Sequence, residues 1–230
     1  MSRARTNQDD WQTAAAPESQ GSGCLSGFIL PPLMVLLVGS LLAFFAFNSS
    51  AQSLPMQAPP SGSVQLSPVF TPEVQYWGSS ITRWASASGQ DPNLVATIMQ
   101  IESCGNPFAR SGAGAIGLFQ VMPYHFLASD DPSAPDTNAA RGLAYLGRSL
   151  SASSNDARLA LAGYNGGIGV ISRAEWSWPA ETIRYAYWGG GIYADAVSGA
   201  SHSSRLDEWL TAGGASLCRK ASVVLGINNK

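Results

Sequence analysis

Residues 95–123 read VATIMQIESCGNPFARSGAGAIGLFQVMP, and this stretch decides how the rest of the chain is interpreted. Its first part predicts a helix. Asp91 followed by Pro92 is typical of a helix start, because the Asp side chain can cap the first turn and the fixed φ of proline suits the first helical position. Gly105 and Pro107 are typical of a helix end. The helix therefore ends shortly after residue 102.

The apolar face of this helix carries one acid. Val95, Ile98 and Met99 recur at helical spacing, and the next position on their face is Glu102. Burial and the negative end of the helix dipole both disfavour a charged carboxylate, so both are expected to raise its pKa. A carboxyl group that stays protonated near neutral pH suits a general acid. The alternative is an ordinary glutamate at a helix end whose side chain bends toward solvent.

The second part of the stretch, residues 111–123, is rich in glycine before Leu-Phe-Gln. Such a run does not favour a regular helix. It predicts a tight loop or a short hairpin, in which the backbone and Gln120 can approach a ligand closely.

A third motif, GYNGG at residues 163–167, follows a helix that we predict over about 155–163. The paired glycines free the backbone to turn and to present Tyr164 and Asn165. By itself the motif could be only a helix C-cap. Together with Glu102 and Gln120 it is better interpreted as the third wall of a ligand-binding groove.

These three motifs resemble those of the SLT-type lytic transglycosylases in type, order and spacing, and the resemblance covers about residues 71–187. It implies a mainly α-helical, lysozyme-like domain with a small β-hairpin or loop region near residues 110–122. It also implies an enzyme without a cofactor that cleaves the β-1,4 bond between N-acetylmuramic acid and N-acetylglucosamine in peptidoglycan. The product ends in a 1,6-anhydro ring, and Glu102 acts first as acid and then as base.

The resemblance also implies roles around the acid. Ser103 helps to position the acid or the sugar. Gln120 and Asn165 hydrogen-bond the N-acetyl or hydroxyl groups of the sugar, and Tyr164 and Tyr185 offer their ring faces to it.

Two other functions remain open at this stage. A lysozyme-like muramidase on the same fold would need a second carboxylate to place a water molecule, and Asp130, Asp131 and Asp136 follow the glycine-rich motif. A membrane-tethered module that binds muropeptides without turnover is the other alternative. An acid on an apolar helix face argues against this second alternative, because binding alone does not require it.

The amino-acid composition limits the domain organisation and the kinds of ligand that the chain can have. The chain has 230 residues, 45% hydrophobic and 12% charged, with a net charge of -2, which predicts one ordinary domain plus an appendage. Basic residues are scattered along the chain and form no cluster, so no nucleic-acid surface is indicated. His125 and His202 lack a spaced Cys or Asp partner, so we predict no metal site.

The appendage is N-terminal. Residues 25–47 contain no charged residue and are long enough to cross a bilayer, so they predict a single transmembrane helix or uncleaved signal anchor. The two arginines upstream place residues 1–24 in the cytoplasm as a tail. Residues 48–70 have the Pro- and Ser-rich composition of a linker, which leaves residues 71–230 as the exported domain. A cleaved signal peptide is the alternative, and it would release the domain as a secreted protein.

Three cysteines are present, and Cys24 lies on the predicted cytoplasmic side. Cys104 and Cys218 would both be exported, and an oxidising compartment favours a disulfide between them over two buried free thiols.

Further helices are expected on both sides of the motifs. One runs over about 71–88 with Trp77 and Trp84 in the core, and one over about 138–149 with Thr137 or Asn138 as its cap. A helix that opens near residue 179 is expected to be interrupted at residues 189–191, and two last helices follow. The sequence does not indicate an oligomeric state.

Overall fold

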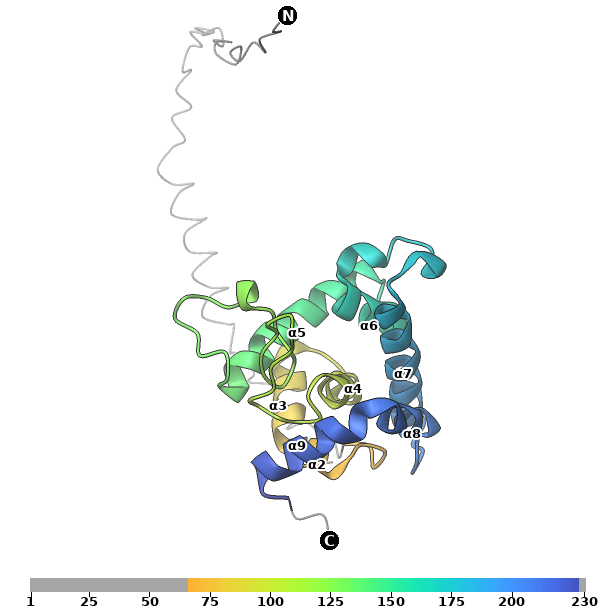
Figure 1. Ribbon diagram of the computed structural model, residues 1–230. Helices are drawn as coiled ribbons and strands as arrows, with labels where there is room; N and C mark the ends of the chain where they lie inside the picture. The colour runs from red at the N-terminus through yellow and green to blue at the C-terminus, as the bar shows by residue number, and fades with distance from the viewer. Residues whose placement is uncertain (1–65, 228–230) are drawn as a thin grey trace, which may run out of the picture. The chain divides into compact units, whose positions relative to one another are not determined.

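The computed structural model of the chain describes residues 66–227, and these residues fold mainly into helices (Figure 1). They contain no named strand, only the isolated bridges Arg110 to Ile116 and Ile116 to Val121. The predicted mainly α class is confirmed, and the region predicted as a small hairpin or loop is a loop with isolated bridges. The α-helices are α2 Pro72–Gln75, α3 Gly78–Ser88, α4 Pro92–Glu102, α5 Pro135–Ala152, α6 Ala157–Gly166, α7 Ala180–Val197, α8 Ser204–Trp209 and α9 Ala215–Leu225.

Helix α4 lies at the centre of this arrangement, with α3 and α7 packed against it (Figure 1). All residues from Leu94 to Gln100 are buried, including the polar Thr97 and Gln100. The helix is therefore enclosed on all sides and not amphipathic with one buried face. The catalytic candidate at its end consequently projects from a rigid, fully packed element.

The ends of α4 follow the predicted signals. Asp91 caps the first turn by accepting a hydrogen bond from the backbone N–H of Asn93 at 2.7 Å. At the other end, Glu102 is the last helical residue, and Cys104 and Gly105 adopt left-handed φ values of 51° and 83°. These two residues turn the chain sharply away from the helix, and so fix where the side chain of Glu102 leaves it.

Asn138 holds the glycine-rich loop, which corrects its predicted role as a helix cap. Helix α5 begins at Pro135, three residues earlier, because proline suits the first turn of a helix. The buried side chain of Asn138 accepts a hydrogen bond from the N–H of Phe119 at 2.9 Å and donates to the carbonyl of Ile116 at 2.8 Å. Gly117 approaches so closely that an added Cβ would lie 2.4 Å from Nδ2 of Asn138.

Two helix predictions need correction. The helix expected over 71–88 breaks at Tyr76 and Trp77, and Trp77 Nε1 donates to the carbonyl of Gly105 at 2.8 Å. The expected interruption at 189–191 is absent, since α7 runs straight through these glycines. A Cβ at Gly191 would lie 2.3 Å from Cγ of Arg205, so the missing side chain makes room for a neighbour.

The structure describes only part of the predicted membrane anchor and linker. The transmembrane segment 25–47 and most of the linker lie outside the described residues. The end of the linker packs into the core, because Leu66, Val69 and Phe70 are buried. Among residues 66–227, no helix is both long enough and apolar enough to span a bilayer.

Candidate active site

Glu102 and Tyr185 form the centre of the site. The phenol of Tyr185, in α7, donates a hydrogen bond to Oε1 of Glu102 at 2.8 Å. Glu102 is partly buried, whereas Tyr185 is 5% exposed. The carboxyl group is thus held by one donor at the junction of α4 and α7.

Its surroundings keep the Glu102 carboxyl protonated. The pKa of Glu102 is raised to about 8, mainly because the protein desolvates the carboxyl group; the hydrogen bond from Tyr185 acts against this rise, and the negative charge of Glu181 adds to it. The residue itself retains a solvent-facing part, so the desolvation comes from the dense protein around the carboxyl and not from complete enclosure. At neutral pH the group therefore has a proton to donate.

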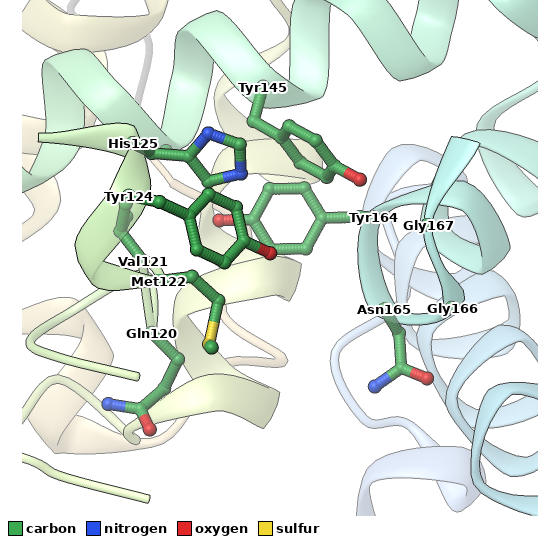
Figure 2. A pocket seen from close by; sticks show the side chains of 11 residues that line it. Gln120, Val121, Met122, Tyr124, His125, Tyr145, Tyr164, Asn165, Gly166 and Gly167 are labelled. Atoms are coloured by element: carbon green, nitrogen blue, oxygen red, sulfur yellow. The ribbon is translucent and has the colours of Figure 1, made fainter. Parts of the chain in front are cut away.

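A pocket of about 280 Å³ lies beside this acid (Figure 2). Gln120 and Asn165 stand on two sides of it, and Tyr164 lies between them. Glu102 is not part of the pocket wall, but it is near enough to Tyr164 for its charge to raise the pKa of the phenol, after the larger effect of burial. The pocket volume is near the low end of small-molecule sites, which range over about 300–1,000 Å³.

The three pocket residues predicted from the motifs are brought together and fixed by the protein. Tyr164 donates to the carbonyl of Phe119 at 2.8 Å. Gln120, at a left-handed φ of 44°, donates through its amide to the carbonyl of Gly117 at 3.0 Å. The side-chain oxygen of Asn165 accepts from the hydroxyl of Thr182 at 2.8 Å, which leaves its NH₂ group for a ligand.

Two of the predicted site residues are buried and have partners within the protein. Ser103 is fully buried and donates to the carbonyl of Leu118 at 2.7 Å, so it ties the glycine-rich loop to the end of α4. Tyr185 is buried against Glu102 and does not line the pocket, so it holds the acid and does not offer a ring face to sugar. Both residues sit next to the acid in the fold, and sequence proximity to a motif does not reveal which way a side chain points.

The acids considered as a second carboxylate lie elsewhere. Asp130 forms a bidentate ion pair with Arg141, and hydrogen bonds from Arg141 and the backbone of Leu127 lower its pKa. Asp136 accepts from Trp84 Nε1 at 2.7 Å. The side chain of Asp131 accepts from the N–H of Ser133. None of the three lines the pocket.

The sequence reasoning missed two features. Glu181 lies one turn before Tyr185 on α7, and its charge acts on Glu102. Tyr124, His125 and Tyr145 form an aromatic wall of the pocket (Figure 2). The adjacent Tyr124 and His125 directly after the GLFQVMP motif were the available signal, but Tyr145 comes from a separate helix that only folding brings near.

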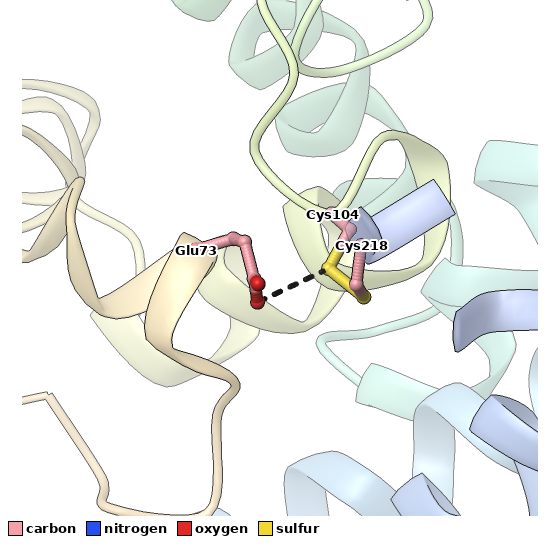
Figure 3. Close-up of side chains that lie close together, drawn as sticks. All are labelled: Glu73, Cys104 and Cys218. Atoms are coloured by element: carbon pink, nitrogen blue, oxygen red, sulfur yellow. Dashed lines mark hydrogen bonds between the residues drawn. A yellow bond between two sulfur atoms is a disulfide. The ribbon is translucent and has the colours of Figure 1, made fainter. Parts of the chain in front are cut away.

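The predicted disulfide between Cys104 and Cys218 is present, and it joins α9 to the turn after α4 (Figure 3). Glu73 is 3% exposed and accepts a hydrogen bond from Ser222, and one of its oxygens lies 4.0 Å from Sγ of Cys104. A carboxylate and two sulfurs so close together resemble a metal site. Sulfurs joined in a disulfide are not thiolates, so this set is not a metal centre while the bridge is intact.

Known proteins that are similar to this chain are transglycosylases. Residues 79–185 match the family described as Transglycosylase SLT domain. A transglycosylase of Enterobacteria phage PRD1 is 35% identical, over 47% of this chain and 40% of that protein. An endo-type membrane-bound lytic murein transglycosylase A of Klebsiella pneumoniae is 34% identical, over 34% of this chain and 48% of that protein. The chain therefore spans less than half the length of these two relatives.

A solved structure shows a further likeness. It is an inactive mutant of the lytic transglycosylase Slt of Pseudomonas aeruginosa, with 24% sequence identity and a TM-score of 0.45 over 53% of this chain and 24% of that one.

Proposed function

We propose that this chain, whose residues 79–185 match the family described as Transglycosylase SLT domain, is a peptidoglycan lytic transglycosylase. One observation carries the proposal: a single carboxyl group with a raised pKa, Glu102, lies beside a pocket whose wall contains no carboxylate. Relatives named lytic murein transglycosylases support the substrate class. We propose in addition that the helical domain has a lysozyme-like fold.

The chemistry follows from one acid used twice. Protonated Glu102 gives its proton to the glycosidic oxygen between N-acetylmuramic acid and N-acetylglucosamine, and the C1–O bond breaks. The C6 hydroxyl oxygen of the muramic acid then bonds to C1, and the Glu102 carboxylate takes the hydroxyl proton. The proton count of Glu102 is restored, no water is consumed, and the product ends in a 1,6-anhydro ring.

Surrounding residues prepare these steps. The phenol of Tyr185 donates to Oε1 of Glu102, so the acidic proton is placed on the other oxygen before transfer and the charge is stabilised after it. Gln120 and Asn165 present amides to the pocket, which suits the N-acetyl and hydroxyl groups of a sugar. The ring of Tyr164 provides the apolar surface between them.

A hydrolase is the second candidate, because the charge of Glu181 reaches Glu102 and could place a water molecule. The mass of the products from purified peptidoglycan separates the two functions. We expect muropeptides lighter by one water than those of a hydrolase. Products with the full mass would overturn the transglycosylase and favour the muramidase.

We also propose that residues 25–47 anchor the domain in the membrane with its site outside the cytoplasm. The uncharged length of this segment supports an anchor, as does the membrane-bound description of several relatives. We expect the full chain to stay in the membrane fraction through an alkaline wash. Recovery of a soluble form that begins near Gln52 would instead show a cleaved signal peptide.

A further inference from the structure

An arginine stands at the aromatic end of the pocket. The guanidinium carbon of Arg148, on α5, lies 5.1 Å from the ring centroid of Tyr145. The Tyr145 ring lines the pocket, with its centroid 4.9 Å from that of His125 and 5.6 Å from that of Tyr164. Arg148 itself does not line the pocket, so its charged group lies beyond the aromatic end of the pocket.

The charge of Arg148 is not neutralised by the protein. Within residues 66–227, no carboxylate forms an ion pair with Arg148, whereas Arg141 on the same helix is paired with Asp130 at 2.7 Å. The field of Arg148 nevertheless reaches the pocket, since after desolvation it is the second cause that lowers the pKa of His125. An exposed, stacked and unpaired guanidinium is well suited to a planar carboxylate.

We propose that Arg148 binds a carboxylate of the peptide that the glycan strand carries, so that the enzyme favours peptide-bearing strands whose carboxylates are free. This inference rests on the proposed function. A sugar ring held by Gln120, Tyr164 and Asn165 fills the pocket, so a group that reaches Arg148 has to extend beyond the ring. In peptidoglycan the muramic acid carries a peptide with free carboxylates, and its shorter lactyl group ends in a carboxylate only when the peptide is removed.

The contact is expected to contribute modestly. Arg148 is exposed, so solvent and salt screen the pair, although stacking on Tyr145 reduces the freedom that the side chain loses on binding. We expect a five- to tenfold effect on kcat/KM, which corresponds to about 1 to 1.4 kcal/mol. The effect should appear in KM and not in kcat, because the pair is equally strong before and during bond cleavage.

The test uses one preparation of peptide-bearing strands in two forms, one with free peptide carboxylates and one with these groups converted to amides. The full chain should process the free form with a kcat/KM about five- to tenfold higher than the amidated form. Arg148→Gln should process both forms alike, and at the rate of the parent on the amidated form. Arg219→Gln, on α9 and outside the pocket wall, should keep the preference of the parent.

Each other outcome overturns the inference. A parent without preference shows that no carboxylate is recognised, and a preference retained by Arg148→Gln assigns it to another residue. The parent and Arg148→Gln should process peptide-free strands, which carry the lactyl carboxylate, with the same kcat/KM. A lower kcat/KM of Arg148→Gln on these strands would mean that Arg148 binds the lactyl carboxylate or that the substitution damages the pocket. Failure of the proposed function is distinct, since the parent would then release no anhydro product from any strand.

Discussion

Glu102→Gln is expected to reduce turnover of peptidoglycan by more than the ~10²–10⁴ that one general acid typically contributes. Glutamine keeps the shape of the side chain and can still accept the hydrogen bond from Tyr185, but it has no transferable proton. The loss should be large because Glu102 is proposed to serve as acid and as base, and no carboxylate lines the pocket beside it. Release of anhydro-muropeptides, followed by mass spectrometry, measures it.

Two matched substitutions make this result interpretable. Glu208→Gln, an exposed position on α8 that pairs with Arg205, should keep parental turnover. Glu181→Gln removes the charge that acts on Glu102 and should leave most of the activity. A loss at Glu181→Gln as large as that at Glu102→Gln would mean that two carboxylates share the chemistry. Substantial activity in Glu102→Gln would place the acid elsewhere.

Glu102→Gln is also expected to change how the free energy of unfolding depends on pH. The pKa of Glu102 is raised from 4.5 to about 8 on folding, so between these pH values the folded protein holds a proton that the unfolded chain has lost. The free energy of unfolding of the parent should therefore fall as pH rises through this window, and level off above it. Glutamine does not titrate, so the variant lacks this loss. Urea unfolding of both proteins at several pH values measures the difference, which should grow from pH 4.5 to pH 8.

Loss of the disulfide is expected to have the largest effect on stability. The bridge between Cys104 and Cys218 closes a loop with a sequence separation of 114 residues. In the chain-entropy account, a loop of that length contributes about 4 to 5 kcal/mol by restricting the unfolded chain. The Cys104→Ala, Cys218→Ala double variant should lose most of this amount in urea unfolding under oxidising conditions.

Control experiments distinguish the effect of losing the disulfide from the effect of replacing the two cysteine side chains. Cys24→Ala should unfold like the parent, because Cys24 takes no part in the bridge. A reducing agent should destabilise the parent and leave the double variant unchanged. The double variant should also lose turnover before it unfolds, since Cys104 lies two residues after Glu102 and the bridge ties that turn to α9. Equal stability with and without the bridge would show that packing alone fixes this end of α4.

Local signals in the sequence determined a good part of this protein. The Asp91-Pro92 start, the end of α4 at Glu102 and the helical class all follow from capping, proline and glycine rules that act over a few residues. Gln120, Tyr164 and Asn165, which two of the motifs supply, line one pocket in the structure. The raised pKa of Glu102 was also anticipated in direction, since an acid on an apolar helix face has to lose solvent.

Only the tertiary structure decided what each neighbour does. Asn138 and Ser103 hold the glycine-rich loop, and Tyr185 holds the acid, through contacts between residues far apart in the chain or through side-chain directions that no local pattern encodes. The same holds for the charge of Glu181 on Glu102 and for Arg148 over Tyr145. Local rules act through backbone geometry within a few residues, whereas desolvation, ion pairing and pocket shape depend on which helices pack together.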